Sequence, residues 1–164
     1  MCVWKRNVRR QQWHNFGWAM VLCQGIGLIG AVLTLASVRG WYNDLRQPAF
    51  MPPNWLFAPV WLILYTLLAI VLTMLIIKRP KPAVRDAQRL FLVQLVLNAL
   101  WTPLFFGWHW IFLACLDIFA LWAAIIWLVI QIRPLKPLAA WLLLPYLLWV
   151  SLAVCLNVSI WFLN

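Results

Sequence analysis

Charged residues are scarce in this sequence, and acidic ones are nearly absent. Only 10% of the 164 residues are charged, and three acidic side chains stand against thirteen lysines and arginines. The sequence contains no GxSxG, HExxH, phosphate-loop or glycine-rich nucleotide motif, and no pair of carboxylates for acid–base work. A conventional hydrolase or transferase mechanism therefore has no residues to act through, and an enzymatic role stays undecided.

Cysteine is also scarce, which bears on disulfides and metals. The four cysteines are Cys2, Cys23, Cys115 and Cys155. They show neither CxxC nor metal-ligand spacing, and three of them lie in apolar segments. Such thiols usually behave as small buried hydrophobes. We expect neither a disulfide nor a metal site.

Apolar residues, by contrast, make up most of the chain. They account for 66% of it, with 14 tryptophans, and several runs reach the roughly 20 residues that cross about 30 Å of hydrocarbon. The sequence therefore predicts an all-α integral membrane protein with a single domain over residues 16–164, after a basic arm at residues 1–15. We expect five transmembrane helices, at about 16–38, 58–77, 89–107, 110–132 and 138–162.

The basic residues lie almost entirely between the apolar runs. The N-terminal arm and the connectors after the second and fourth spans hold eleven of the thirteen, and the other side has only Arg39 and Arg46. The positive-inside rule then places the N-terminus in the cytoplasm and the C-terminus outside. Because topology accounts for the net charge of +10, we expect a lipid bilayer, and no nucleic acid, as the partner.

The segment at residues 39–65 is unusual for a connector. It holds four prolines, which fix the backbone and remove hydrogen-bond donors. Its aromatic side chains, which favour burial, include Trp41, Tyr42, Phe50, Trp55 and Phe57. A solvated loop would need neither property. We expect an ordered loop that folds back as a lid over a pocket and passes into a helix near Pro59.

Polar or aromatic side chains recur every four residues on three of the predicted helices. The third helix carries Gln94, Asn98 and Thr102 beside Trp101, and the second carries Trp61 and Tyr65. The corresponding face of the fifth consists of Trp141, Pro145, Trp149, Ala153, Asn157 and Trp161. Two interpretations stay open. In the first, the amides hydrogen-bond between helices and the tryptophans form a belt at the membrane surface. In the second, the amides and the tryptophans line a cavity for a large, flat, apolar ligand.

Two further features leave alternatives open. Asp117 is the only acid within a span. It is either a proton-relay or substrate carboxylate, or a structural group that is protonated or hydrogen-bonded to a neighbouring helix near the membrane face. On the first span, small residues recur every four positions at Ala19, Cys23, Gly27 and Ala31. Such a face permits close helix packing or leaves room for a ligand.

These residues together resemble the TspO/MBR family of bacterial and mitochondrial translocator proteins. The pattern WYxxLxxPxFxPPxWxFxPVWxxLY matches at residues 41–65, and LNALWTPLFFG matches at residues 97–107. The lone Asp117 and PYLLWVSLAVCLNVSIWFLN at residues 145–164 complete the resemblance. Together with the spacing of the spans, it covers nearly the whole chain from Phe16 onward.

The resemblance implies a five-helix bundle, often a homodimer, with a pocket beneath the loop between the first two helices. The implied ligands are porphyrins such as protoporphyrin IX and haem, and no cofactor is obligatory. Carried over by motif, the pocket residues are Trp55, Asn98, Trp101, Trp149, Ala153 and Leu156. The predicted lid adds Trp41 to this set of ligand-binding candidates.

The resemblance also bears on chemistry and on sterols. Some bacterial members promote light-dependent breakdown of protoporphyrin, with tryptophans that match Trp55 and Trp149, so these are the candidate catalytic residues. Animal members carry an aromatic-then-basic sterol pattern near the end of the fifth helix. Residues 156–164 contain neither Tyr nor Lys nor Arg, so high-affinity sterol binding is not expected.

The predicted function is a porphyrin receptor in the bacterial inner membrane, acting in tetrapyrrole sensing, handling or light-dependent degradation. Two alternatives remain. The first is a transporter of porphyrin or other apolar solutes, although no inverted repeat of the kind common in transporters is visible. The second is a non-catalytic regulatory membrane scaffold. Flux into proteoliposomes would identify the transporter, and ligand-dependent crosslinking to other membrane proteins would identify the scaffold.

Overall fold

A computed structural model describes residues 2–38, 40–77 and 81–164, without the side chains of residues 2–9, 36 and 38. The elements in chain order are α1 (Cys2–Val38), α2 (Trp41–Asp44), α3 (Asn54–Ile76), α4 (Pro82–Thr102), η1 (Pro103–Gly107), α5 (Ile111–Ile132) and α6 (Pro137–Leu163). These described ranges contain no strand. Five of the helices are long and apolar enough to cross a membrane, which confirms the predicted all-α membrane fold.

Three helices begin earlier than the sequence predicts. α1 begins at Cys2 rather than near residue 16, because its basic start contains no proline or glycine and is rich in good helix formers. α3 begins at Asn54, so Pro59 lies inside the helix instead of at its start. α4 begins at Pro82 rather than near residue 89, since proline suits the first turn of a helix.

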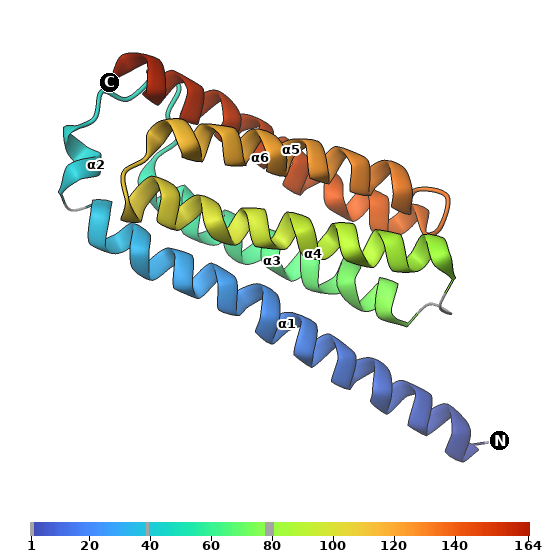
Figure 1. Ribbon diagram of the computed structural model, residues 1–164. Coiled ribbons are helices and arrows are strands. Elements are labelled where there is room, and N and C mark those ends of the chain that lie inside the picture. Colours follow the sequence, from blue (N-terminus) through green and yellow to red (C-terminus); the bar gives the residue numbers. More distant parts are fainter. Residues whose placement is uncertain (1, 39, 78–80) are drawn as a thin grey trace.

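Helices α3 to α6 run alongside one another, and the N-terminal half of α1 diverges from them (Figure 1). The membrane-spanning part of α1 is only 11% buried inside the protein, against 28–44% for the other four spans. Most of α1 is therefore not covered by the rest of the chain. Its largest exposed apolar residues include Val21, Leu28, Ile29, Val32 and Leu35.

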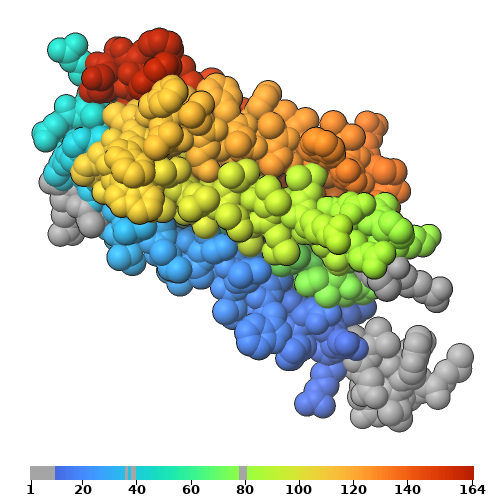
Figure 2. All heavy atoms as spheres, viewed as in Figure 1, coloured from blue at the N-terminus to red at the C-terminus, as the bar shows by residue number. Residues whose placement is uncertain are grey.

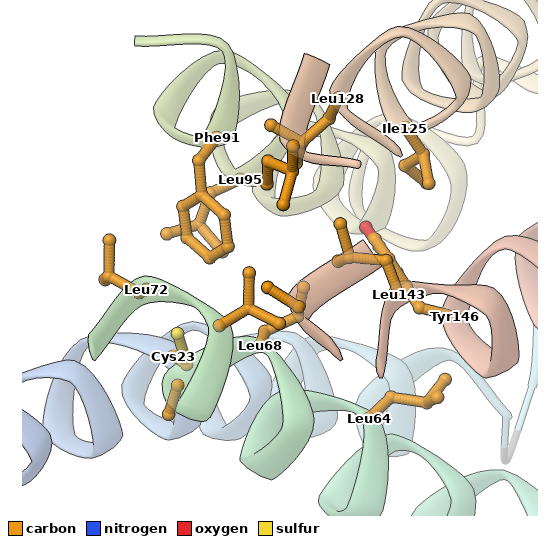
Figure 3. Packing of buried hydrophobic residues seen from close by; sticks show 14 of the residues in the cluster. Cys23, Leu64, Leu68, Leu72, Phe91, Leu95, Ile125, Leu128, Leu143 and Tyr146 are labelled. Carbon is orange, nitrogen blue, oxygen red and sulfur yellow. The ribbon is translucent and has the colours of Figure 1, made fainter. Parts of the chain in front are cut away.

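The core is a narrow seam between the helices (Figure 3). Its fully buried side chains include Leu68 on α3, Phe91 on α4, Leu128 on α5, and Leu143 and Tyr146 on α6. Outward-facing apolar side chains remain exposed because lipid, rather than water, surrounds them. Within the bilayer the seam is stabilised by close packing more than by the hydrophobic effect.

Small residues on α1 allow it to pack closely against α3. Ala19 and Cys23 are buried, and a Cβ atom placed on Gly27 would lie 2.7 Å from the Tyr65 ring. Ala31 is exposed and lies outside this contact. At Gly27 the small face therefore serves helix packing, which was one of its two interpretations.

The connection from α4 to α5 is short, as predicted. Pro103 lacks a backbone N–H, and the chain changes there to the wider η1 turn, in which Trp108 N–H donates to the Pro103 carbonyl at 2.8 Å. His109 then adopts a positive φ of 59° and reverses the chain. α4 and α5 consequently pack as neighbouring antiparallel helices.

Candidate functional site

Asn98 lies at the centre of a buried hydrogen-bond network that joins three helices. The Tyr65 hydroxyl on α3 donates to Asn98 Oδ1 at 2.6 Å, and Asn98 Nδ2 donates to the Tyr146 hydroxyl on α6 at 2.8 Å. Tyr146 in turn donates to Gln94 Oε1 at 3.0 Å. All four side chains are buried. The amide stripe thus fixes α4 against two aromatic faces.

Thr102 does not join this network, although it shares the predicted stripe. Positions four apart on a helix advance by about 40°, so the stripe turns by about 80° from Gln94 to Thr102. Thr102 accordingly lies against α1, where a Cβ atom on Gly30 would be 3.2 Å from its hydroxyl oxygen. The three residues do form a stripe along α4, but the stripe does not face one neighbour. Its first two residues contact α3 and α6, and Thr102 contacts α1.

Trp101 belongs to a second contact between α4 and α6. Its indole N–H donates to Asn157 Oδ1 at 2.9 Å, and Asn157 Nδ2 donates to the Ile111 carbonyl at 3.3 Å. The Trp101 ring also stacks on Phe105 of η1, with 5.2 Å between ring centroids. Because its only polar atom is bonded, Trp101 presents a flat apolar ring in a fixed orientation.

The other candidates on α6 lie near this region. Trp149 is half-buried and meets Phe57 of α3 edge to face, with a centroid distance of 5.5 Å. Ala153 and Trp149 both pack against the main core, and Leu156 is 6% exposed. We name the combined set the amide–aromatic cluster: Phe57, Trp61, Tyr65, Gln94, Asn98, Trp101, Tyr146, Trp149, Ala153, Leu156 and Asn157.

The loop between α1 and α3 packs at the end of the bundle where η1 joins α4 to α5. Trp41 stacks on His109 with a centroid distance of 4.0 Å and meets Phe105 edge to face at 5.8 Å. Tyr42 is buried against Phe105, and this burial raises its pKa. The loop is therefore ordered by aromatic contacts. Through Phe105, it also reaches Trp101.

A polar contact holds the far side of the loop. The Asn164 side chain accepts from the Arg46 N–H at 2.9 Å and donates to the Arg46 carbonyl at 3.2 Å. This pairing connects the loop directly to the end of α6. The loop is thus held by side chains from both η1 and α6.

Trp55 is not brought into the amide–aromatic cluster. It lies in the first turn of α3 and is 71% exposed. Of the proposed ligand-binding set, Asn98 and Trp101 are hydrogen-bonded to side chains of α6. Trp149 and Ala153 pack against the main core, Leu156 is buried, and Trp41 lies on Phe105. Trp55 precedes Phe57 by two residues in α3, so the two side chains do not share a face of the helix.

Two buried polar atoms have no hydrogen-bond partner among the described residues. They are Gln94 Nε2, a donor, and Asp117 Oδ2, an acceptor. The proposed hydrogen bond from Asp117 to a neighbouring helix is therefore not formed at this oxygen. Buried donors and acceptors are usually hydrogen-bonded, so we expect ordered water or a polar group of a ligand beside these two atoms.

An enclosed cavity beneath the loop is not apparent. Two open hollows in the described part of the chain lie between α4 and α5 and between α1 and α4. Neither is lined by the amide–aromatic cluster. The same described residues contain no group of three His, Cys, Asp or Glu that could hold a metal ion.

Three aromatic residues that contact the candidate residues were not among the predicted site residues, although Phe57 was expected to be buried. Tyr146 was hidden because it lies one position from the four-residue repeat of its helix, yet it contacts both Asn98 and Gln94. Phe57 and Phe105 orient Trp149 and Trp101. A buried amide needs hydrogen-bond partners, and the predicted spans contain few other polar side chains. The hydroxyl of Tyr146 was therefore a partner that the sequence could have indicated.

Comparison with known proteins assigns the fold to a family. Residues 19–162 match the TspO/MBR family. The chain is 41% identical to the tryptophan-rich protein TspO of Archaeoglobus fulgidus, over 85% of this chain and 90% of that protein. It is 32% identical to the tryptophan-rich sensory protein of Cereibacter sphaeroides, over 92% and 94%. It is 35% identical to the translocator protein of Ovis aries, over 80% and 82%.

Proposed function

Because the chain belongs to the TspO/MBR family and is an integral membrane protein, we propose that it is a receptor for porphyrins such as protoporphyrin IX and haem. The receptor acts in tetrapyrrole sensing, handling or light-dependent degradation. A relative named as a sensory protein supports the sensing role. The ligand is held at the amide–aromatic cluster, under the loop between α1 and α3.

The observation that carries this proposal is the position of Asn98. It is 4% exposed and is hydrogen-bonded to Tyr65 and Tyr146. Trp101 follows Asn98 by about one turn on α4, and Trp149 follows Tyr146 by about one turn on α6. A flat aromatic ligand gains from stacking on such rings, and a few buried polar groups give it orientation. A porphyrin combines a large flat ring with polar substituents, so its chemistry suits both parts of the cluster.

The edge-to-face pair of Phe57 and Trp149 marks the point of entry in this proposal. Separation of these two rings, which lie 5.5 Å apart, would expose the face of Trp149 to the ligand. Trp55, two residues before Phe57 on α3, is exposed, and we propose that its indole folds inward on binding to cover the other face. In this proposal an indole gives one electron to the light-excited porphyrin, which passes it to dioxygen and forms superoxide. The indole radical cation then takes one electron from the porphyrin, so the tryptophan is restored and superoxide attacks the porphyrin radical cation that remains.

We extend the proposal to topology and assembly. The basic end of the bundle faces the cytoplasm of a bacterium, so the loop and the C-terminus lie on the outer side of the inner membrane. The family resemblance supports a homodimer. The porphyrin would therefore reach the cluster from the outer half of the bilayer.

Replacing Trp149 with alanine is expected to weaken binding of protoporphyrin IX in the dark by about 2- to 12-fold, since one stacked aromatic ring contributes about 0.5–1.5 kcal/mol. The measurement is a titration of the purified protein followed by the porphyrin absorption band. Trp141→Ala is the matched control, because Trp141 lies on the same helix and is 68% exposed. Equal weakening by both substitutions would place the ligand elsewhere.

A further inference from the structure

A groove of about 300 Å³ lies between α4 and α5, far along α4 from Trp101. Its lining residues are Asp86, Arg89, Leu90, Val93, Trp127 and Gln131. α4 and α5 lie side by side on the face of the molecule shown in Figure 2. The groove shares no residue with the amide–aromatic cluster, so the porphyrin proposal does not account for it.

The lining of the groove changes from polar to apolar. Asp86 and Arg89 lie in the first turns of α4, whereas Leu90 and Val93 continue toward the middle of the span. Trp127, across from them on α5, is 61% exposed. Exposed tryptophan at the end of a span is typical of the layer where hydrocarbon meets lipid headgroups. The groove therefore suits an amphiphilic ligand.

The polar end of the groove lies in a strongly basic region. Arg85, Arg89 and Arg133 are exposed there, and of the three acidic residues in the sequence only Asp86 lies at this end. Asp86 contacts Arg89 through one N···O distance of 3.4 Å, and the two side chains are 54% and 78% exposed. Such an exposed pair is weak. The Arg89 guanidinium thus keeps donors that could bind a phosphate oxygen.

We propose that this groove binds an anionic phospholipid. The Arg89 guanidinium and the Gln131 amide contact the phosphate, and an acyl chain lies along Leu90, Val93 and the Trp127 ring. Asp86 opposes the negative headgroup and sets an upper limit on its affinity. A second copy of the chain is a poorer occupant, because it would bring the same excess of positive charge.

The test uses the full chain in neutral detergent, with native mass spectrometry to count the lipids bound to each protein. Phosphatidylglycerol is the anionic probe and phosphatidylcholine the neutral one. Arg89→Gln is expected to weaken phosphatidylglycerol binding about fivefold, as estimated for one basic residue at a charged membrane surface. It should leave phosphatidylcholine nearly unchanged. Asp86→Asn is expected to strengthen phosphatidylglycerol binding, because it removes the opposing charge.

Arg10→Gln is the matched control. Arg10 is also exposed and belongs to the basic N-terminal part of α1, which diverges from α4 and α5 (Figure 1). A field of diffuse positive charge would make Arg10→Gln and Arg89→Gln equally harmful, and that result would overturn the proposal. So would an unchanged or weakened affinity in Asp86→Asn. Inorganic phosphate is added in a parallel titration, and displacement of the lipid by millimolar phosphate would show a site for the free anion instead.

Discussion

Replacing Gly27 with alanine is expected to lower the free energy of unfolding by about 2 kcal/mol. The added Cβ atom would lie 2.7 Å from two carbons of the Tyr65 ring. That ring cannot move freely, since it stacks on Trp61 and its hydroxyl is bonded to Asn98. Overpacking of this kind costs about 1–3 kcal/mol. Chemical denaturation in detergent micelles would measure the change.

Other glycines of α1 provide graded controls. A Cβ atom on Gly25 meets nothing within 4 Å, whereas one on Gly30 meets the Thr102 hydroxyl at 3.2 Å. Gly25→Ala should be neutral or stabilising by up to about 1 kcal/mol, because alanine favours the helix. Gly30→Ala should fall between the two. Equal effects at all three positions would contradict close packing of α1 on Tyr65.

Replacing Asn98 with leucine is expected to destabilise the protein by about 2 kcal/mol. The substitution leaves the buried Tyr65 hydroxyl without its acceptor and removes the bond that Tyr146 accepts. A buried donor left unpaired costs about 1–3 kcal/mol. The same substitution should weaken porphyrin binding, because it removes the central amide of the proposed site. Denaturation and dark titration would measure the two effects separately.

A double substitution tests the physical reason for this loss. In the variant with both Tyr65→Phe and Asn98→Leu, the unpaired hydroxyl is absent, so part of the lost stability should return. Removing both partners of a buried bond is typically less harmful than removing one. A double variant that is as unstable as the sum of its single variants would show that Asn98 and Tyr65 act independently.

The membrane fold is predictable from the sequence, because five long apolar runs have few structures open to them in lipid. The helix starts are less so. From the sequence, Pro59 is predicted to mark the start of a helix. A helix within a bundle can nevertheless contain a proline in its second turn, as α3 does. The number of spans follows from composition, whereas their ends depend on local backbone conformation.

The site is only partly predictable for a related reason. The repeats at Asn98 and at Trp149 identify helix faces, and the structure confirms that Asn98 lies on an interface between helices. Which face meets which neighbour depends on how the helices cross, and the sequence does not specify that. Thr102 therefore lies against α1, and Asn98 is hydrogen-bonded to Tyr146, which no repeat indicated.

Titration of protoporphyrin IX into the purified protein, first in the dark and then under illumination, tests the central claim most directly. Tryptophan fluorescence and the porphyrin absorption band are followed together. The proposed receptor should show saturable quenching in the dark and loss of the band in the light. Replacing both Trp55 and Trp149 with phenylalanine should keep most of the binding but suppress the loss, because phenylalanine retains a flat ring that is far harder to oxidise.

Trp13→Phe is the control for the illumination, since Trp13 is 66% exposed and Trp55 is 71% exposed. Loss of the band that continues unchanged in the double variant would exclude the two tryptophans from the chemistry. Saturable binding without light-dependent loss would leave a sensor or carrier. The porphyrin account predicts saturable binding, and a titration without saturation would contradict it.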